Sequence, residues 1–163
     1  MCRIDIGTII VHTLNVRTLN VHTHKYFTHQ PIADTKKGAM SRIESFEDLE
    51  CWTAARDLVH LVYDLTRNAS FVHDFGLKDQ IRKAAVSSMS NIAEGFARFS
   101  DREFIRFLDI AQSSCEEVKS LLYVAVDQKY IDKEEFGQAF AKASDVRFLC
   151  LAFVRYLRKS SAR

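Results

Sequence analysis

From residue 45 onwards, apolar residues recur at spacings of three and four, which is the 3.6-residue period of an amphipathic helix. This pattern comes in four segments separated by short polar stretches. Their apolar stripes run from Leu49 to Leu65, from Leu77 to Ile92, from Phe104 to Ala125 and from Phe136 to Leu157. No alternating strand pattern competes within residues 45–160. The sequence therefore predicts an all-α fold.

Capping signals indicate where these helices begin. Three segments start with an N-cap residue followed three positions later by an acid, namely Ser45 with Asp48, Ser100 with Glu103, and Asp132 with Glu135. The second helix is expected to begin after Gly76. Loops of about three to nine residues between helices of roughly 20–28 residues force neighbouring helices to run in opposite directions. The expected architecture is an antiparallel up-down-up-down four-helix bundle.

Residues 1–40 differ in kind from the rest of the chain. The stretch "VHTLN VRTLN VHTHK" at residues 11–25 repeats every five residues, a period that fits neither a strand nor a helix. We interpret residues 1–40 as a disordered extension, or as sequence upstream of a true start at Met40, and residues 41–163 as the bundle domain. Metal capture by His22 and His24 is an alternative for the extension, but no carboxylate or cysteine completes a ligand set.

Charge is divided unevenly along the chain, whose net charge is +2. Residues 1–40 contain five Lys/Arg and two Asp/Glu, whereas residues 41–163 contain 18 and 19. The bundle domain is therefore close to neutral. Charge alone does not indicate indiscriminate binding to nucleic acid.

Cysteine usage and hydropathy favour a cytoplasmic protein without a membrane partner. The four cysteines are far apart and form no Cys-x-x-Cys pair, which is typical of buried free thiols in a reducing compartment. No run of about 18 apolar residues could span a membrane. The opening "MCRIDIGTIIVHT" is a poor signal peptide, because it lacks a basic start and a small-residue cleavage site.

A line of polar residues follows one edge of the second helix, beside its apolar stripe. On a helical wheel its members fall within about 40° of one direction, and they are Gln80, Ser87, Asn91, Glu94 and Arg98. On the third helix, a matching polar face is formed by Glu103, Ser114 and Glu117. If the two helices pack antiparallel, these faces can meet, with Ser87 or Asn91 opposite the middle of the third helix.

Three interpretations of these polar faces remain open. In the first they form a structural seam, in which Arg98 pairs with Glu103 or Glu94 and Asn91 bonds across the bundle to fix the register. In the second they form a subunit interface, and in the third an active site. The bundle carries no Glu-x-x-His metal motif, Walker loop, Gly-x-Ser-x-Gly turn or Cys/His dyad. We therefore predict a protein that is not an enzyme and holds no metal or cofactor.

Two further features of the same region carry predictions. Gly95, within a segment rich in alanine, indicates a close approach of another helix, because a helical glycine otherwise costs about 1 kcal/mol. Five cations near the turn between the second and third helices are candidates for phosphate contact, namely Arg82, Lys83, Arg98, Arg102 and Arg106. The alternative is an ordinary solvated rim, since Asp101, Glu103 and Asp109 are interleaved with them.

Three stretches resemble the bacterial four-helix-bundle family of the 23S rRNA intervening sequence proteins. They are "FEDLECWTAARDLVHLVYDLT", "FGLKDQIRKAAVSSMSNIAEGFAR" and "EFIRFLDIAQSSCEEVKSLLYVA", and the "SNIAEG" block at residues 90–95 is the most specific. The resemblance covers about residues 45–158 and implies a ring-shaped homopentamer. A related branch accompanies retroelement reverse transcriptases and binds nucleic acid through a basic surface. No catalytic residue can be transferred from the family.

The sequence departs from the family pattern at Lys83, Ser88 and Ser113, where Arg, an apolar residue and Gly are usual. Its near-neutral bundle also lacks the strong positive charge of the nucleic-acid-binding branch. We therefore expect a non-enzymatic, oligomeric assembly or adaptor protein that associates with RNA or a ribonucleoprotein. The alternative is a self-assembling protein-interaction module that does not bind nucleic acid.

Overall fold

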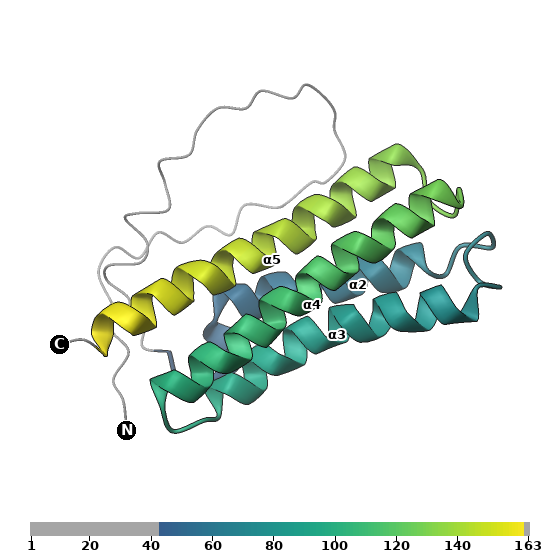
Figure 1. The fold of residues 1–163 in the computed structure, drawn as a ribbon. Coiled ribbons are helices and arrows are strands. Elements are labelled where there is room, and N and C mark those ends of the chain that lie inside the picture. Colours follow the sequence, from purple (N-terminus) through teal and green to yellow (C-terminus); the bar gives the residue numbers. More distant parts are fainter. Residues whose placement is uncertain (1–42, 162–163) are drawn as a thin grey trace, which may run out of the picture. The chain divides into compact units, whose positions relative to one another are not determined.

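The computed structural model describes residues 43–161, which form a bundle of long helices (Figure 1). A short 3-10 helix, η1 (Phe46–Asp48), precedes α2 (Glu50–Leu65), α3 (Phe75–Phe96), α4 (Asp101–Asp127) and α5 (Lys133–Ser160). No strand occurs between residues 43 and 161. The predicted all-α fold of four long helices is confirmed. The expectations for residues 1–40, including the site at His22 and His24 and the start at Met40, lie outside the described residues.

Side-chain caps fix the starts of α4 and α5. The Ser100 hydroxyl accepts a hydrogen bond from the backbone N–H of Glu103 at 3.3 Å. The Asp132 carboxylate accepts two backbone N–H groups of the first turn of α5 at 2.8 Å, and Glu135 accepts the Asp132 N–H at 2.9 Å. The capping box predicted at Asp132 is therefore complete. The one predicted at Ser100 is only half formed, and the Glu103 carboxylate pairs with Arg106.

The first α-helix begins one turn later than the sequence predicts. The Asp48 carboxylate accepts the backbone N–H groups of Glu44 at 2.9 Å and Ser45 at 3.0 Å, which lowers the pKa of Asp48. These bonds close the short helix η1. Leu49 follows in an extended conformation, with φ −80° and ψ 120°, so the α-helical ladder starts only after it. The expected start at Ser45 is thus the start of η1.

The start of α3 also differs from the prediction. The Asp74 carboxylate accepts the backbone N–H of Leu77 at 2.9 Å, so Asp74 is the N-cap. Gly76 consequently lies inside the first turn instead of ahead of the helix. This cap could not be recognised from the sequence, because no acid follows Asp74 three residues later and the surrounding loop contains both aromatic and polar residues.

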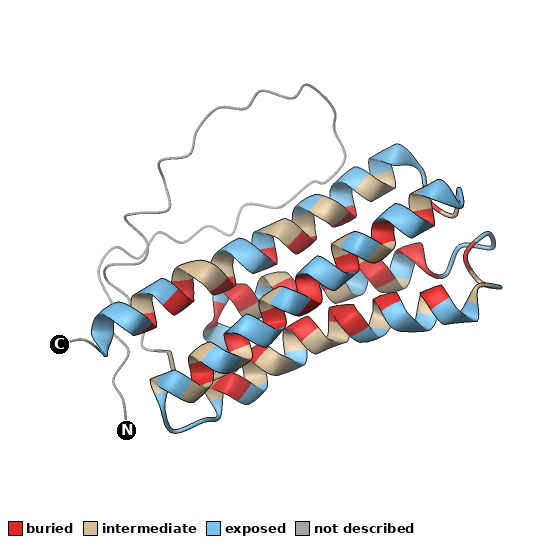
Figure 2. Ribbon diagram, viewed as in Figure 1, coloured by how far each residue is buried: buried red, intermediate tan, exposed pale blue. Residues whose placement is uncertain are grey.

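Each helix turns one apolar stripe towards the centre of the bundle, as the buried positions in Figure 2 show. Leu58, Ile81, Leu108 and Val146, one from each helix, are at most 1% exposed. Burying a side chain of this size contributes about 1.5–3 kcal/mol relative to leaving it in water. The core is therefore the main source of stability, and the polar residues discussed below lie at its edge.

The helices pack in a ring in which α2 contacts α3 and α5, and α4 contacts α3 and α5. Between α3 and α4, Gln80 bonds to Glu117, whereas the later residue Ser87 meets the earlier residue Ser114. These two helices therefore run antiparallel, and Figure 1 shows the same alternation along the chain. This arrangement brings the polar edges of α3 and α4 together.

Between residues 43 and 161, three free thiols lie in the core, as predicted, whereas Cys2 lies outside the described residues. Cys51 of α2 is 4% exposed, and Cys115 of α4 and Cys150 of α5 are 0% exposed. Burial raises the pKa of the Cys115 thiol to about 12, although a hydrogen bond with Ser88 opposes this shift. The neighbouring Cys51 thiol and burial both raise the pKa of Cys150. The folded bundle thus keeps the Cys115 and Cys150 thiols neutral.

Candidate functional site

The polar edges of α3 and α4 form one continuous strip, which we call the polar seam. It consists of Gln80, Ser87, Asn91, Glu94 and Arg98 of α3 with Glu103, Ser114 and Glu117 of α4. Two hydrogen bonds cross between the helices. The Gln80 amide donates to a Glu117 carboxylate oxygen at 3.2 Å, and the Ser87 and Ser114 hydroxyl oxygens are 2.9 Å apart.

A directed chain of hydrogen bonds occupies the middle of the polar seam. The Asn91 Nδ2 group donates to the Ser87 backbone oxygen at 2.8 Å and to the Ser87 hydroxyl at 3.1 Å. The Ser114 hydroxyl donates to the backbone oxygen of Ile110 at 3.0 Å, so Ser87 must be the donor between the two serines. Each hydroxyl therefore donates once and accepts once. Asn91 supports Ser87 within its own helix and makes no bond across the bundle.

Near the C-terminal end of α3, Arg98 of the polar seam is paired with a residue of its own helix. Its guanidinium bonds to the Glu94 carboxylate and lies over the Phe107 ring, 4.7 Å from the ring centroid. Glu103 pairs with Arg106 of its own helix at 3.5 Å. Of the two partners that the sequence allowed for Arg98, the structure therefore selects Glu94. The link from Arg98 to α4 is a cation–π contact, not an ion pair.

Gly95 permits α3 and α4 to approach each other closely near the C-terminal end of α3. A Cβ atom at Gly95 would lie 2.7 Å from Phe104 Cδ2 and 2.7 Å from Phe107 Cβ. Real Cβ atoms do not approach other heavy atoms this closely, so α4 occupies the space that a side chain would need. The close contact expected from the sequence occurs within one chain. Gly95 also lies in the last turn of α3, which ends at Phe96.

Arg82 faces the C-terminus of α2, away from the turn between α3 and α4. Its Nε atom donates to the Thr66 hydroxyl at 2.7 Å, and its Nη2 atom donates to the Thr66 backbone oxygen at 3.3 Å. The guanidinium also lies 4.6 Å from the centroid of the Tyr63 ring. Arg82 thus satisfies orphan carbonyl and hydroxyl groups at the end of α2. This position contradicts its predicted membership of one cationic cluster.

The five cationic candidates do not form one surface. Arg82 and Arg98 are separated along α3 by about 24 Å at 1.5 Å per residue. Lys83 pairs with Asp79 at 2.6 Å, and Arg98 and Arg106 are paired as described above. Arg102 is exposed and has no hydrogen-bond or ion-pair partner among residues 43–161. The rise of 1.5 Å per residue places Arg82 and Lys83 too far from the turn between α3 and α4 to join the expected cluster. This separation could have been worked out from the sequence.

A profile of the 23S rRNA-intervening sequence protein family matches residues 47–150. The chain belongs to this family. Its fold is similar to a crystal structure of a protein with unknown function from the S23 ribosomal protein family of Bacteroides thetaiotaomicron VPI-5482. That likeness has a TM-score of 0.59 and 20% sequence identity, and it covers 64% of this chain and 97% of the other. No curated protein matches the chain.

The part matched by the 23S rRNA-intervening sequence protein family contains the whole polar seam. The profile match confirms the family resemblance found in the sequence. Three cations, Arg155, Arg158 and Lys159, follow the matched part near the end of α5. From the sequence alone, these cations indicate only a favourable helix C-terminus. The structure shows in addition that the packing of α4 on α5 brings Arg158 and Arg102 to the same groove.

Over residues 43–161, no three His, Cys, Asp or Glu side chains converge in a way that could hold a metal ion. No helix in this part of the chain is long and apolar enough to cross a membrane. What the polar seam can do is hold two helices in register and present a mixed polar and apolar edge.

Proposed function

We propose that this member of the 23S rRNA-intervening sequence protein family is a non-catalytic assembly module, which self-associates through the outer edge of α3 and α4. The observation that carries the proposal is a stripe on α4 with spacings of three and four. Its members are Phe107, Ile110, Ser114, Glu117, Leu121 and Val124. This is the heptad spacing by which one helix packs against another.

Two apolar side chains of this stripe remain partly exposed in the bundle. Ile110 is 38% exposed and Val124 is 43% exposed, while Glu117 between them is also exposed. The three lie seven residues apart, so they occupy one line along α4. A helix of a second copy lying along this line would bury both apolar side chains. Glu117, at the centre of this line, would then favour one register between the helices of the two copies. A shifted partner helix would bury the Glu117 carboxylate against apolar groups.

Homo-oligomerisation is tested by the solution mass of the full chain, measured by light scattering during size-exclusion chromatography. The native chain is expected to have several times the mass of one chain, and a pentamer is the expected number. The double variant Ile110→Glu/Val124→Glu places two carboxylates in the proposed contact. A loss of about 4 kcal/mol lowers association about a thousandfold, so this variant is expected to be a helical monomer.

Phe148 provides the matched control, because it is 49% exposed and lies on α5. Phe148→Glu is expected to leave the solution mass unchanged. A monomeric native chain would refute the proposal. So would a variant pattern in which Phe148→Glu breaks the oligomer and the double variant on α4 does not, since the contact would then lie on α5.

Association with RNA is the second candidate function. It is favoured by Arg102, whose exposed guanidinium has no partner in the described part of the chain. Binding to RNA should weaken as salt rises, and Arg98→Glu with Arg102→Glu should reduce it while the helical spectrum is retained. Filter binding over a salt series measures both effects. Binding that is absent, or that does not respond to salt, would exclude this candidate.

A further inference from the structure

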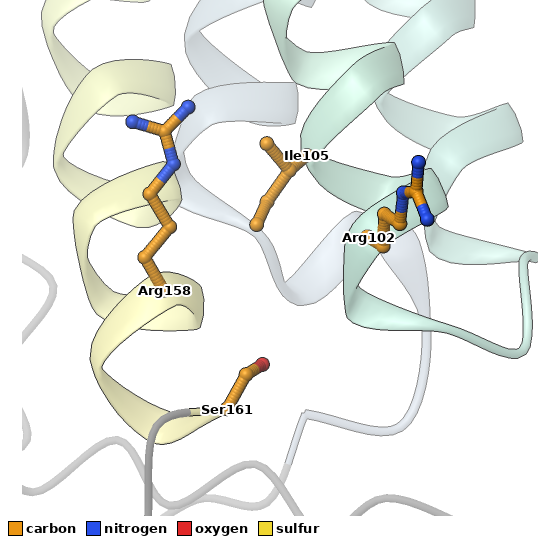
Figure 3. Close-up of a pocket in the computed structure, with 4 residues that line it drawn as sticks. All are labelled: Arg102, Ile105, Arg158 and Ser161. Carbon is orange, nitrogen blue, oxygen red and sulfur yellow. The ribbon is translucent and has the colours of Figure 1, made fainter.

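A shallow groove of about 360 Å³ lies between the start of α4 and the end of α5. It is lined by Arg102 and Ile105 of α4, Arg158 of α5, and Ser161. Figure 3 shows Arg102 and Arg158 on opposite sides of the groove with Ile105 between them. The groove therefore has two guanidinium groups at its margins and an apolar side chain at its centre.

Neither guanidinium is neutralised within the described part of the chain. No hydrogen bond or ion pair joins Arg102 or Arg158 to another residue between 43 and 161. The nearby Asp101 carboxylate accepts a hydrogen bond from the Ser161 hydroxyl at 2.8 Å, and Glu103 pairs with Arg106. These two acids therefore have other partners, and both arginines remain available to a ligand.

The local charge balance favours an anion. Residues 155–161 contain three cations and no acid, and residues 100–106 contain two of each sign. The positive start of α4 and the negative end of α5 act in opposite directions, each equivalent to about half a charge. Their effects largely cancel, so the arginine side chains decide the sign of the potential in the groove.

We propose that this groove binds a phosphate group between Arg102 and Arg158. A guanidinium presents a planar fork of donors that matches two oxygens of a phosphate, and two such forks can contact one phosphate or two successive ones. The groove is open instead of enclosing, so a phosphodiester of an RNA chain and a free phosphate compound are both compatible with its shape. The proposal gives the RNA candidate a site, but it does not depend on self-association.

Two probes distinguish the sources of the phosphate. Inorganic pyrophosphate is titrated into the full chain while the arginine Nε–Hε resonances are followed by NMR. A fluorescent single-stranded oligouridine is titrated by anisotropy between 50 and 200 mM salt. Two phosphate contacts to a single strand contribute about −1.4 to the slope of log affinity against log salt, which is about a sevenfold loss over this range. Arg102→Ala/Arg158→Ala is expected to remove that contribution and any pyrophosphate shifts.

A matched variant controls for the loss of two positive charges. Arg56 and Lys133 are exposed, lie outside the groove and have no partner between residues 43 and 161. Arg56→Ala/Lys133→Ala should bind both probes like the native chain. Pyrophosphate binding without oligouridine binding would assign the groove to a small phosphate compound, and the reverse would assign it to RNA. Either result supports the site if Arg102→Ala/Arg158→Ala abolishes the observed binding.

Three outcomes would overturn the phosphate site. The native chain could bind neither probe, or the groove variant could bind both as well as the native chain does. A polyglutamate peptide could also bind with the same affinity and the same dependence on Arg102 and Arg158, which would assign the groove to carboxylates. The solution mass of the groove variant should equal that of the native chain. Its loss of phosphate binding is therefore separable from any failure of self-association.

Discussion

Substituting Gly95 by alanine tests how closely α3 and α4 approach each other. In a helix, Gly→Ala ordinarily stabilises by up to about 1 kcal/mol. Here the new Cβ would lie 2.7 Å from both Phe107 Cβ and Phe104 Cδ2. Phe107 Cβ is fixed to the backbone of α4 and cannot rotate away, and the Phe104 ring packs against Phe153 at a centroid distance of 5.2 Å.

The helices must therefore separate, and overpacking of this kind costs about 1–3 kcal/mol. After the gain in helix propensity is subtracted, Gly95→Ala is expected to lower the free energy of unfolding by up to about 2 kcal/mol. For a bundle of about 120 residues, each kcal/mol corresponds to about 4 °C in Tm. Urea unfolding followed by far-UV circular dichroism, with thermal melts, measures both quantities.

Gly137 supplies the control, because it is exposed in the interior of α5 and no atom lies within 4 Å of a Cβ built there. Gly137→Ala should raise the free energy of unfolding by about 1 kcal/mol. The two substitutions change the same atoms, so their difference isolates the contact with α4. If Gly95→Ala stabilises the protein as much as Gly137→Ala does, the proposed close contact is wrong.

Two further predictions concern buried polar groups. Thr66→Val removes a hydroxyl that accepts from Arg82 Nε at 2.7 Å and is 1% exposed. It should cost about 1–3 kcal/mol in urea unfolding, because it leaves the half-buried Arg82 without that acceptor. The raised pKa of Cys115, about 12, means that the unfolded chain releases this proton first as pH rises. The free energy of unfolding should therefore fall above about pH 9, by up to about 1.4 kcal/mol per pH unit for this thiol.

Each of these predictions has a direct check. Thr53 is exposed on α2, so Thr53→Val should change stability by less than about 0.5 kcal/mol. An equal effect at Thr53 and Thr66 would show that the hydrogen bond to Arg82 contributes nothing. For the thiol, Cys115→Ala should flatten the fall in stability between pH 9 and 11. An identical pH slope in the native chain and the variant would contradict the assignment.

The polar seam shows how far the sequence could lead towards a site. The wheel position of Ser87 and the matching position of Ser114 were enough to expect contact between α3 and α4, and the two hydroxyls are 2.9 Å apart. The partner of Arg98 could not be chosen, because Glu94 and Glu103 are both within reach of a long side chain. The Phe107 ring beneath Arg98 favours the arrangement in which Arg98 stays on its own helix. The use of these residues in oligomerisation or RNA binding stays a prediction.

The sequence by itself determined the four helices, their apolar faces and the starts of α4 and α5. Apolar periodicity and capping act within one or two turns, so the residues that decide them are close together in the chain. The tertiary structure alone decided that Arg82 caps α2 and that Arg102 and Arg158 share a groove. A change of one residue in register turns a side chain by 100° and moves it by 1.5 Å along its helix. Only the packed surfaces, such as α4 against Gly95, select one register from the several that the same pattern allows.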